Sequence, residues 1–264
     1  MSRRPDARTL PGRGTVVAVH AHPDDEALWT GGALAAAAAA GRRTVLVVAT
    51  DGEAGLADEG LCHGLGRLRV AELERSAEAL GVARVVLLGH RDSGSGTPAP
   101  GGFATLDPAA VAPEVAAVLR EEDAELVTSY DGAGGYGHPD HVQVHRVVRA
   151  AVALLGDDAP RLLEATVERE RVLAASRLLR GLGRVLPVPR VPDLSEKFTP
   201  REEITLRLDV RRQLGPKVRA IAAHGSQRTG GPRTASLLVR LPRALQRRVL
   251  GTEWFVEVPQ PTRA

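Results

Sequence analysis

Short apolar runs alternate with helix-forming segments over residues 1–160, and this alternation is the strongest constraint on the fold. The runs 15–21 (TVVAVHA) and 44–50 (TVLVVAT) are continuously apolar, which is typical of strands buried on both faces of a parallel sheet. Further strands are expected at 83–88 and 125–130, and helices at 26–40, 67–80, 108–121 and 138–155. Strands that alternate with helices in this way predict an α/β fold with a mostly parallel sheet and helices on both faces.

The second part of the chain carries a weaker pattern. Strands are expected at 204–210 and 252–258 and a helix at 217–224, so residues 161–264 are predicted to form a smaller C-terminal α/β portion that covers the core at 14–160. Residues 175–192 and 239–249 mix arginine with apolar residues and proline. Their interpretation is solvated helix faces and loops, with a lid or a membrane-surface patch as the alternative. Residues 1–13 are polar and are expected to be a flexible arm before a single domain at 14–264.

Composition excludes several classes of protein. Cys62 is the only cysteine, so an intramolecular disulfide and a thiolate zinc cluster are impossible, and any metal must bind His, Asp or Glu. Aromatic residues make up 3% and the net charge is +3, which argues against nucleic acid as a partner. The sequence has no run of 18 apolar residues, and its first residues lack the apolar core of a signal peptide, so a cytoplasmic protein without a spanning helix is expected.

Charge is divided unevenly between the two parts. Residues 1–160 carry 14 basic and 22 acidic groups, whereas residues 161–264 carry 21 basic and 10 acidic groups. The carboxylates needed for a cation site therefore lie mostly in the first part. The basic second part is expected to meet the substrate, and a peripheral contact with anionic lipid is the less favoured alternative.

Two unusual clusters directly follow predicted strands. His22-Pro23-Asp24-Asp25 follows the run 15–21, and His138-Pro139-Asp140-His141 follows the strand at 125–130 and a glycine-rich turn. The carboxyl ends of parallel strands meet at one edge of a sheet, where ligands bind. His22, Asp25 and His141 together have the composition of a catalytic zinc site whose fourth position is left to water, although Fe²⁺ and Co²⁺ suit the same donors. The alternative is that the acidic residues only cap the helices that follow.

The neighbours of these ligands suggest acid–base chemistry. Asp24 is within reach of a metal-bound water and would act as the general base. His138, if oriented by Asp140 with a raised pKa, would stabilise an oxyanion. The other histidines of the first part are expected to have ordinary structural or surface roles: His20, His63, His90 and His145.

The paired motifs resemble those of a known family. AHPDDE at 21–26 and HPDH at 138–141 are similar to the motifs of the PIG-L or LmbE-like zinc-dependent N-deacetylases. Flanking segments also fit, among them Asp51-Gly52-Glu53, the R-x-x-E-L helix at 69–73 and KVRAIAAHGSQ at 217–227. The resemblance covers most of the chain and implies a Rossmann-like parallel sheet. It also implies a hydrolase that removes an N-acetyl or other N-acyl group from an amino sugar or glycoconjugate.

The resemblance also assigns roles to individual residues. The implied zinc ligands are His22, Asp25 and His141. The implied catalytic groups are the general base Asp24 and the oxyanion stabiliser His138, oriented by Asp140. The implied substrate-binding groups are Arg69 and Asp92 at sugar hydroxyls or phosphate, Tyr136 over the reacting carbonyl, and His224, whose role the resemblance leaves open.

Other functions remain as alternatives at this stage. The same chemistry would serve an amidase acting on a mycothiol S-conjugate, an acylated glycopeptide or an aminoglycoside intermediate. A nucleotide-binding protein would place G-x-G-x-x-G after the first strand, where this chain has HPDDE. A non-catalytic sugar-binding relative would not need the full set of catalytic residues that the chain carries.

Overall fold

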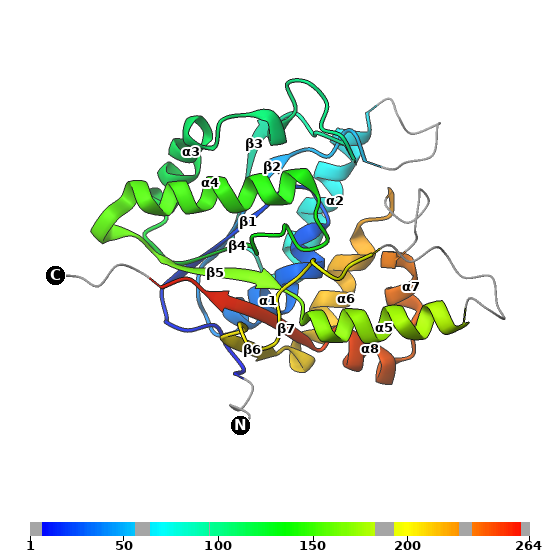
Figure 1. Ribbon diagram of the computed structural model, residues 1–264. Coiled ribbons are helices and arrows are strands. Elements are labelled where there is room, and N and C mark those ends of the chain that lie inside the picture. Colours follow the sequence, from blue (N-terminus) through cyan, green and yellow to red (C-terminus); the bar gives the residue numbers. More distant parts are fainter. Residues whose placement is uncertain (1–6, 56–63, 95, 183–192, 227–233, 260–264) are drawn as a thin grey trace.

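A seven-stranded sheet forms the centre of the molecule (Figure 1). The computed structural model describes residues 7–55, 64–94, 96–182, 193–226 and 234–259. The strand order is β3-β2-β1-β4-β5-β7-β6. The strands are β1 (Thr15–His20), β2 (Thr44–Thr50), β3 (Arg84–His90), β4 (Ala124–Tyr130), β5 (Arg161–Thr166), β6 (Leu206–Asp209) and β7 (Thr252–Glu257). Strands β1 to β5 are parallel, and β7 is antiparallel to both β5 and β6, which confirms the predicted mostly parallel sheet.

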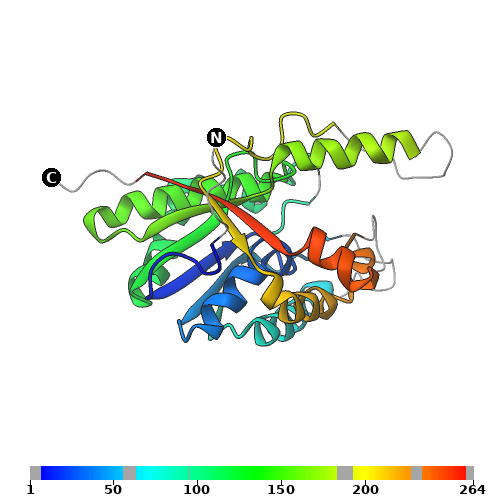
Figure 2. The same cartoon turned by 90° about the horizontal axis from the view of Figure 1, so that it is seen from below.

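Helices cover both faces of the sheet, as predicted. One layer contains α1 (Gly31–Ala39), α2 (Leu65–Leu80) and α6 (Leu214–Ala223), and the opposite layer contains α3 (Pro108–Glu121) and α4 (Pro139–Leu155). Figure 2 shows the sheet between the green helices on one side and the blue, cyan and gold helices on the other. Val16 of β1 belongs to one hydrophobic cluster and Val17 to the other, and neither is exposed. Burial on both faces explains why the strands have continuous apolar sequences.

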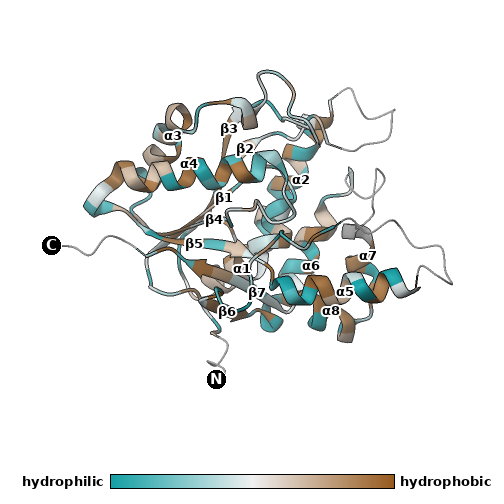
Figure 3. Cartoon of the chain, in the orientation of Figure 1, coloured by the Kyte–Doolittle hydropathy of each residue, from teal (hydrophilic) through white to brown (hydrophobic). Residues whose placement is uncertain are grey.

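The C-terminal portion adds to the same sheet. The strands expected at 204–210 and 252–258 are β6 and β7, whereas β5 was not expected. Helix α5 (Arg169–Leu182) overlaps the segment 175–192, which was interpreted as solvated helix faces and loops. The short helix α7 (Thr234–Arg240) packs against α6, and α8 (Arg243–Val249) precedes β7. Figure 2 shows α5 apart from these two short helices. Hydrophobic and hydrophilic residues alternate along α5 in Figure 3, as they do along α4. The question of a lid at 175–192 falls partly on residues 183–192, which lie outside the described residues.

Residues 7–13 differ from the flexible arm that we expected at 1–13, of which residues 1–6 lie outside the described residues. Ala7 forms a parallel bridge with Leu208 of the edge strand β6, and Leu10 is only 2% exposed within the hydrophobic core. Arg42 donates to the carbonyls of Leu10 and Pro11 at 3.3 and 3.0 Å. Leu10 and the backbone of Ala7 are therefore fixed to the core and to the sheet, because an apolar side chain and a free strand edge provide contacts that the polar composition concealed. In the described part of the chain, no helix is long and apolar enough to span a bilayer.

The single helix expected at 26–40 is two helical pieces. Residues Glu26–Thr30 form a π-helical turn, η1, which leads directly into α1. Buried Glu253 of β7 accepts from the backbone N–H of Gly32 and Ala33 at 2.7 and 2.8 Å, and Lys217 of α6 donates to Glu253 at 2.6 Å. This buried pair therefore fixes the start of α1 and, with it, the turn that precedes it. The remaining short helical turns are η3 (Phe103–Thr105), η4 (Gly156–Asp158) and η5 (Arg211–Gln213).

Candidate metal centre and active site

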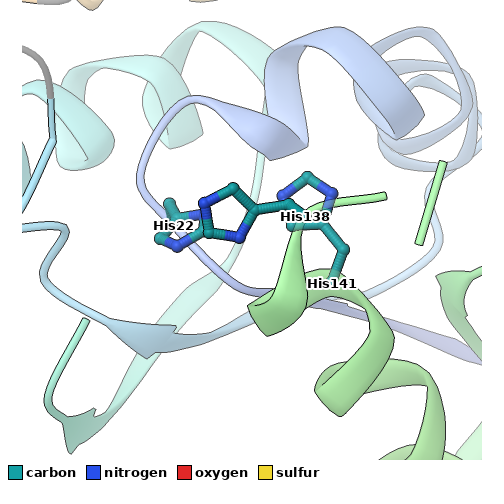
Figure 4. A group of neighbouring side chains, drawn as sticks. All are labelled: His22, His138 and His141. Atoms are coloured by element: carbon teal, nitrogen blue, oxygen red, sulfur yellow. The ribbon is translucent and has the colours of Figure 1, made fainter. Parts of the chain in front are cut away.

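The two histidine-containing clusters meet at the carboxyl edge of the sheet, as expected from the strand order. β1 and β4 are neighbours, so the turn after β1 faces the start of α4. Figure 4 shows the side chains of His22, His138 and His141 gathered there, with His141 on the green helix α4 and His138 directly before it. Each offers a ring nitrogen within 4.8 Å of those of the other two. Topology alone therefore brings together residues that are more than 100 positions apart.

Asp25, the carboxylate of the predicted ligand set, lies beside His22 and His141. Its Oδ2 lies 3.3 Å from His22 Nδ1 and 3.2 Å from His141 Nε2. His141 is fully buried, and neither of its ring nitrogens has a hydrogen-bond partner in the described part of the chain. Burial opposes the charge on Asp25, but the His141 and His22 rings hold the pKa of its carboxyl well below the usual range. An ionised carboxylate that faces two imidazoles fits a divalent metal ion.

A second possible ligand group shares His22. His22 Nε2 lies 3.1 Å from Asp140 Oδ2 and 3.7 Å from Asp92 Oδ1, and the three residues are buried. Asp140 Oδ2 also accepts from the backbone N–H of Ser93 at 3.1 Å. With Nε2–H donating to Asp140, His22 presents Nδ1 to Asp25. A carboxylate on the far nitrogen of a ligating histidine fixes its tautomer and orientation.

This arrangement differs from the expected pairing of Asp140 with His138. The Asp140 carboxylate contacts His22, and only its backbone N–H reaches His138, donating to Nδ1 at 3.2 Å. Burial and the neighbouring His22 and His141 rings lower the pKa of His138 to about 4, so the raised pKa that we expected is wrong. His138 caps α4 through Nδ1, which leaves Nε2 to carry the proton. A neutral imidazole with Nε2–H is still a hydrogen-bond donor.

Tyr130 was missed by sequence reasoning. Its hydroxyl donates to Asp25 Oδ2 at 2.7 Å and accepts from Ala21 N–H at 2.9 Å, and its ring stacks on His141 with centroids 4.1 Å apart. Burial and the Asp25 charge raise the pKa of Tyr130 well above its ordinary value, so the hydroxyl keeps its proton. The sequence did offer one indication of this role, because Tyr130 is the last residue of the strand that precedes HPDH.

Asp24 occupies a conformation that is uncommon for a residue with a side chain. Its φ is 120°, and Arg69 Nη2 lies 3.4 Å from its carboxylate. Burial raises the pKa of Asp24 to about 6, with Arg69 opposing the rise and Asp25 adding to it. A carboxyl group with a pKa near neutrality suits general-base catalysis.

Arg69, predicted to bind substrate, is 3% exposed and contacts protein groups. It donates to the carbonyl of Gly52 at 2.8 Å and to that of Pro23 at 2.6 Å. Gly52 has a φ of 70°, and a Cβ there would lie 2.2 Å from Nη1, so the loop after β2 approaches Arg69 as only glycine permits. Arg69 thus links this loop to the turn that carries Asp24.

The other predicted substrate-binding residues have different exposures. Tyr136 is half exposed, with its ring centroid 5.1 Å from that of His141, so it borders the site from the solvent side. Asp92 is buried, and its Oδ1 accepts from Gly94 N–H at 2.8 Å. His224 is buried behind the turn, with Nε2 2.7 Å from Glu26 Oε1. Of these three, only Tyr136 has a largely accessible side chain.

The remaining histidines have the structural contacts that we expected. His20 bonds Thr30 Oγ1 at 2.8 Å, and burial lowers its pKa to about 4. His90 contacts Glu114, and His145 lies against the Tyr130 carbonyl. His63 lies outside the described residues. None of the three described histidines points to a separate site.

Comparisons with known proteins agree with this geometry. Residues 17–152 match the PIG-L family, described as GlcNAc-PI de-N-acetylase. The chain is 39% identical over 243 residues to a 1D-myo-inositol 2-acetamido-2-deoxy-alpha-D-glucopyranoside deacetylase of Rhodococcus opacus, covering 82% of each protein.

Solved structures share the fold. The N,N'-diacetylchitobiose deacetylase from Pyrococcus horikoshii superposes with a TM-score of 0.65 at 21% identity, covering 93% of this chain and 84% of that one. A 4-carboxy-2-hydroxymuconate hydratase from Pseudomonas putida superposes at 0.64 with 19% identity, covering 95% and 99%. A hydratase on the same fold shows that the fold alone does not determine the reaction. The family match over residues 17–152 and the 39% identity to the Rhodococcus protein rest on sequence and not on the shared fold, and they show that the chain belongs to the PIG-L family.

Proposed function

We propose that the protein hydrolyses the N-acetyl group of an N-acetylglucosamine joined to inositol, releasing acetate and the free amino sugar. The observation that carries this proposal is Asp24, with a pKa raised to about 6, beside the His22, Asp25 and His141 cluster. The substrate is suggested by the Rhodococcus relative, whose name describes that deacetylation.

His22, Asp25 and His141 would hold the metal ion of the site. Two imidazoles and one carboxylate suit Zn²⁺, and Fe²⁺ and Co²⁺ are accepted by the same donors. When bound, the ion supplies Lewis acidity that polarises the acetamide carbonyl and acidifies water. Asp140 and Tyr130 would orient two of the ligands, through His22 Nε2 and Asp25 Oδ2.

The protein's own groups would move the protons. Asp24 takes a proton from the attacking water and later gives it to the departing nitrogen, so the C–N bond breaks with release of a neutral amine. Arg69 keeps the Asp24 carboxylate close to the site by its 3.4 Å contact. The Nε2–H of His138 donates to the carbonyl oxygen as that oxygen becomes negative.

Substitution of the proposed base tests this mechanism. Asp24→Asn keeps the side-chain shape but removes the proton acceptor, and kcat for the acetylglucosaminyl-inositol substrate should fall by about 10²–10⁴-fold. Released amine and acetate are measured together with the metal content of each preparation. His90→Gln, a change at the edge strand, is the control and should keep wild-type turnover. An Asp24→Asn enzyme that retains its metal and near-normal turnover would exclude Asp24 as the base.

A panel of substrates tests the type of reaction separately from the identity of the substrate. N-acetylglucosaminyl-inositol, N-acetylglucosamine, a mycothiol S-conjugate and an acylated glycopeptide are compared by kcat/KM for amine release. The proposal expects the inositol conjugate to be preferred. Preference for another amide would reject the inositol substrate and retain the hydrolysis, whereas no acetate or amine from any compound would favour the non-catalytic alternative.

A further inference from the structure

Asp24 needs an external restraint. Its φ of 120° lies in a region that residues with a Cβ rarely adopt, and such conformations are energetically unfavourable. Such strain persists only when the surroundings over-determine it. The contacts that hold the Asp24 peptide are therefore part of what places its carboxylate.

Glu26 supplies the restraint. Its side chain is fully buried, and Oε2 accepts from the backbone N–H of Asp24 at 2.9 Å. The other oxygen, Oε1, accepts from Ser76 Oγ of α2 and is 2.7 Å from His224 Nε2 at the end of α6. Glu26 thus connects the Asp24 peptide to two helices of one layer.

His224 is itself held in place. It is 1% exposed, and two residues later Ser226 donates from both N–H and Oγ to Glu72 of α2, at 2.8 and 2.6 Å. His224 Nδ1 has no hydrogen-bond partner in the described part of the chain. Its polar contact with the turn is therefore made through Nε2 to Glu26.

We propose that His224 and Glu26 are positioning residues that together hold Asp24 in its left-handed conformation, and that His224 exerts this positioning effect through Glu26. This inference rests on the proposed function because it takes Asp24 as the base. It gives the late histidine a role without substrate contact, in agreement with its burial.

The variants His224→Gln and His224→Asn differ in whether the side chain can still contact Glu26. The amide nitrogen of Gln extends about as far as Nε2 of histidine and can donate to Glu26, whereas that of Asn reaches only the position of Nδ1. Loss of such a restraint should lower kcat by roughly 5- to 160-fold, which corresponds to about 1–3 kcal/mol. We expect this fall for His224→Asn, with KM and metal content within about twofold of wild type, and rescue of most of kcat by His224→Gln.

A double variant tests whether the effect passes through Asp24. In an Asp24→Asn background, His224→Asn should cause no further loss of kcat, because residues that act through one group are non-additive. An equal fall in both backgrounds would overturn the inference, as would wild-type kcat for His224→Asn. If His224→Asn does not fold, Ser76→Ala removes the other side-chain donor to Oε1 and should give a smaller fall with unchanged KM.

Crystal structures of the His224→Asn and His224→Gln variants decide the inference without activity. The expected result is an Asp24 φ that leaves the positive region in the Asn variant and stays near 120° in the Gln variant. A positive φ and an intact Asp24–Glu26 hydrogen bond in both would overturn it. If the wild-type protein does not deacetylate any substrate, the proposed function fails, while these structures still settle the restraint.

Discussion

The hydroxyl of Tyr130 gives the sharpest quantitative prediction about the metal centre. Tyr130→Phe deletes one oxygen and keeps the ring that stacks on His141, so no cavity is created. The lost oxygen is fully buried and donates to Asp25 while accepting from Ala21 N–H. Asp25 then loses its shortest hydrogen bond, and the Ala21 N–H loses a buried acceptor.

The magnitude follows from these contacts. A hydrogen bond to a charged group contributes about 1.5–3 kcal/mol, and an unsatisfied buried donor costs about 1–3 kcal/mol. The two effects share one atom, so we expect the metal-free protein to lose about 3 kcal/mol of unfolding free energy. Groups that orient a metal ligand typically change metal affinity by about 10- to 100-fold when removed. We therefore expect Zn²⁺ to bind Tyr130→Phe about 10- to 100-fold more weakly.

Metal-free protein is titrated with Zn²⁺ in competition with a chromophoric chelator, and urea unfolding is measured on the same samples. Tyr136→Phe is the matched control, because Tyr136 is half exposed and borders the site without touching Asp25. The control should bind Zn²⁺ with wild-type affinity. A Tyr130→Phe affinity within about twofold of wild type would refute the idea that this hydroxyl orients a metal ligand.

Two further predictions concern stability. Lys217→Met leaves the buried Glu253 carboxylate without its cation, so the unfolding free energy measured by urea titration should fall by about 3–5 kcal/mol. Arg161→Met breaks an exposed ion pair with Glu257 and should change the unfolding free energy by less than about 1 kcal/mol. Arg43 and Arg84 lower the pKa of Glu122 to about 2. The Glu122 carboxylate therefore stabilises the folded protein fully at pH values above its unfolded pKa of about 4.3. This stabilisation disappears as the pH falls to about 2. Glu122→Gln should thus be less stable than wild type at pH 7 and equally stable near pH 2, and a gap that persists at pH 2 would contradict this.

The sequence by itself determined the parallel core and the location of the site. Continuous apolar runs such as β1 and β2 report burial on both faces, because both faces of a parallel strand are covered by helices. The turns after β1 and β4 then had to share one edge. Local periodicity was enough for these conclusions, since each depends only on residues within one element. The local pattern was too weak to predict β5, which becomes a strand through pairing with β4 and β7.

Only the tertiary structure decided which groups contact each other within the site. Asp140 contacts His22, which lies 118 positions away, although sequence proximity favoured His138. The hydroxyl of Tyr130 reaches Asp25 across 105 positions, and His224 reaches Glu26 across 198. Such pairs depend on side-chain directions at the ends of different strands and helices, which no local pattern encodes. The sequence therefore identified the candidate histidines and aspartates of the centre but not Tyr130, whereas packing assigned their partners and the strained conformation of Asp24.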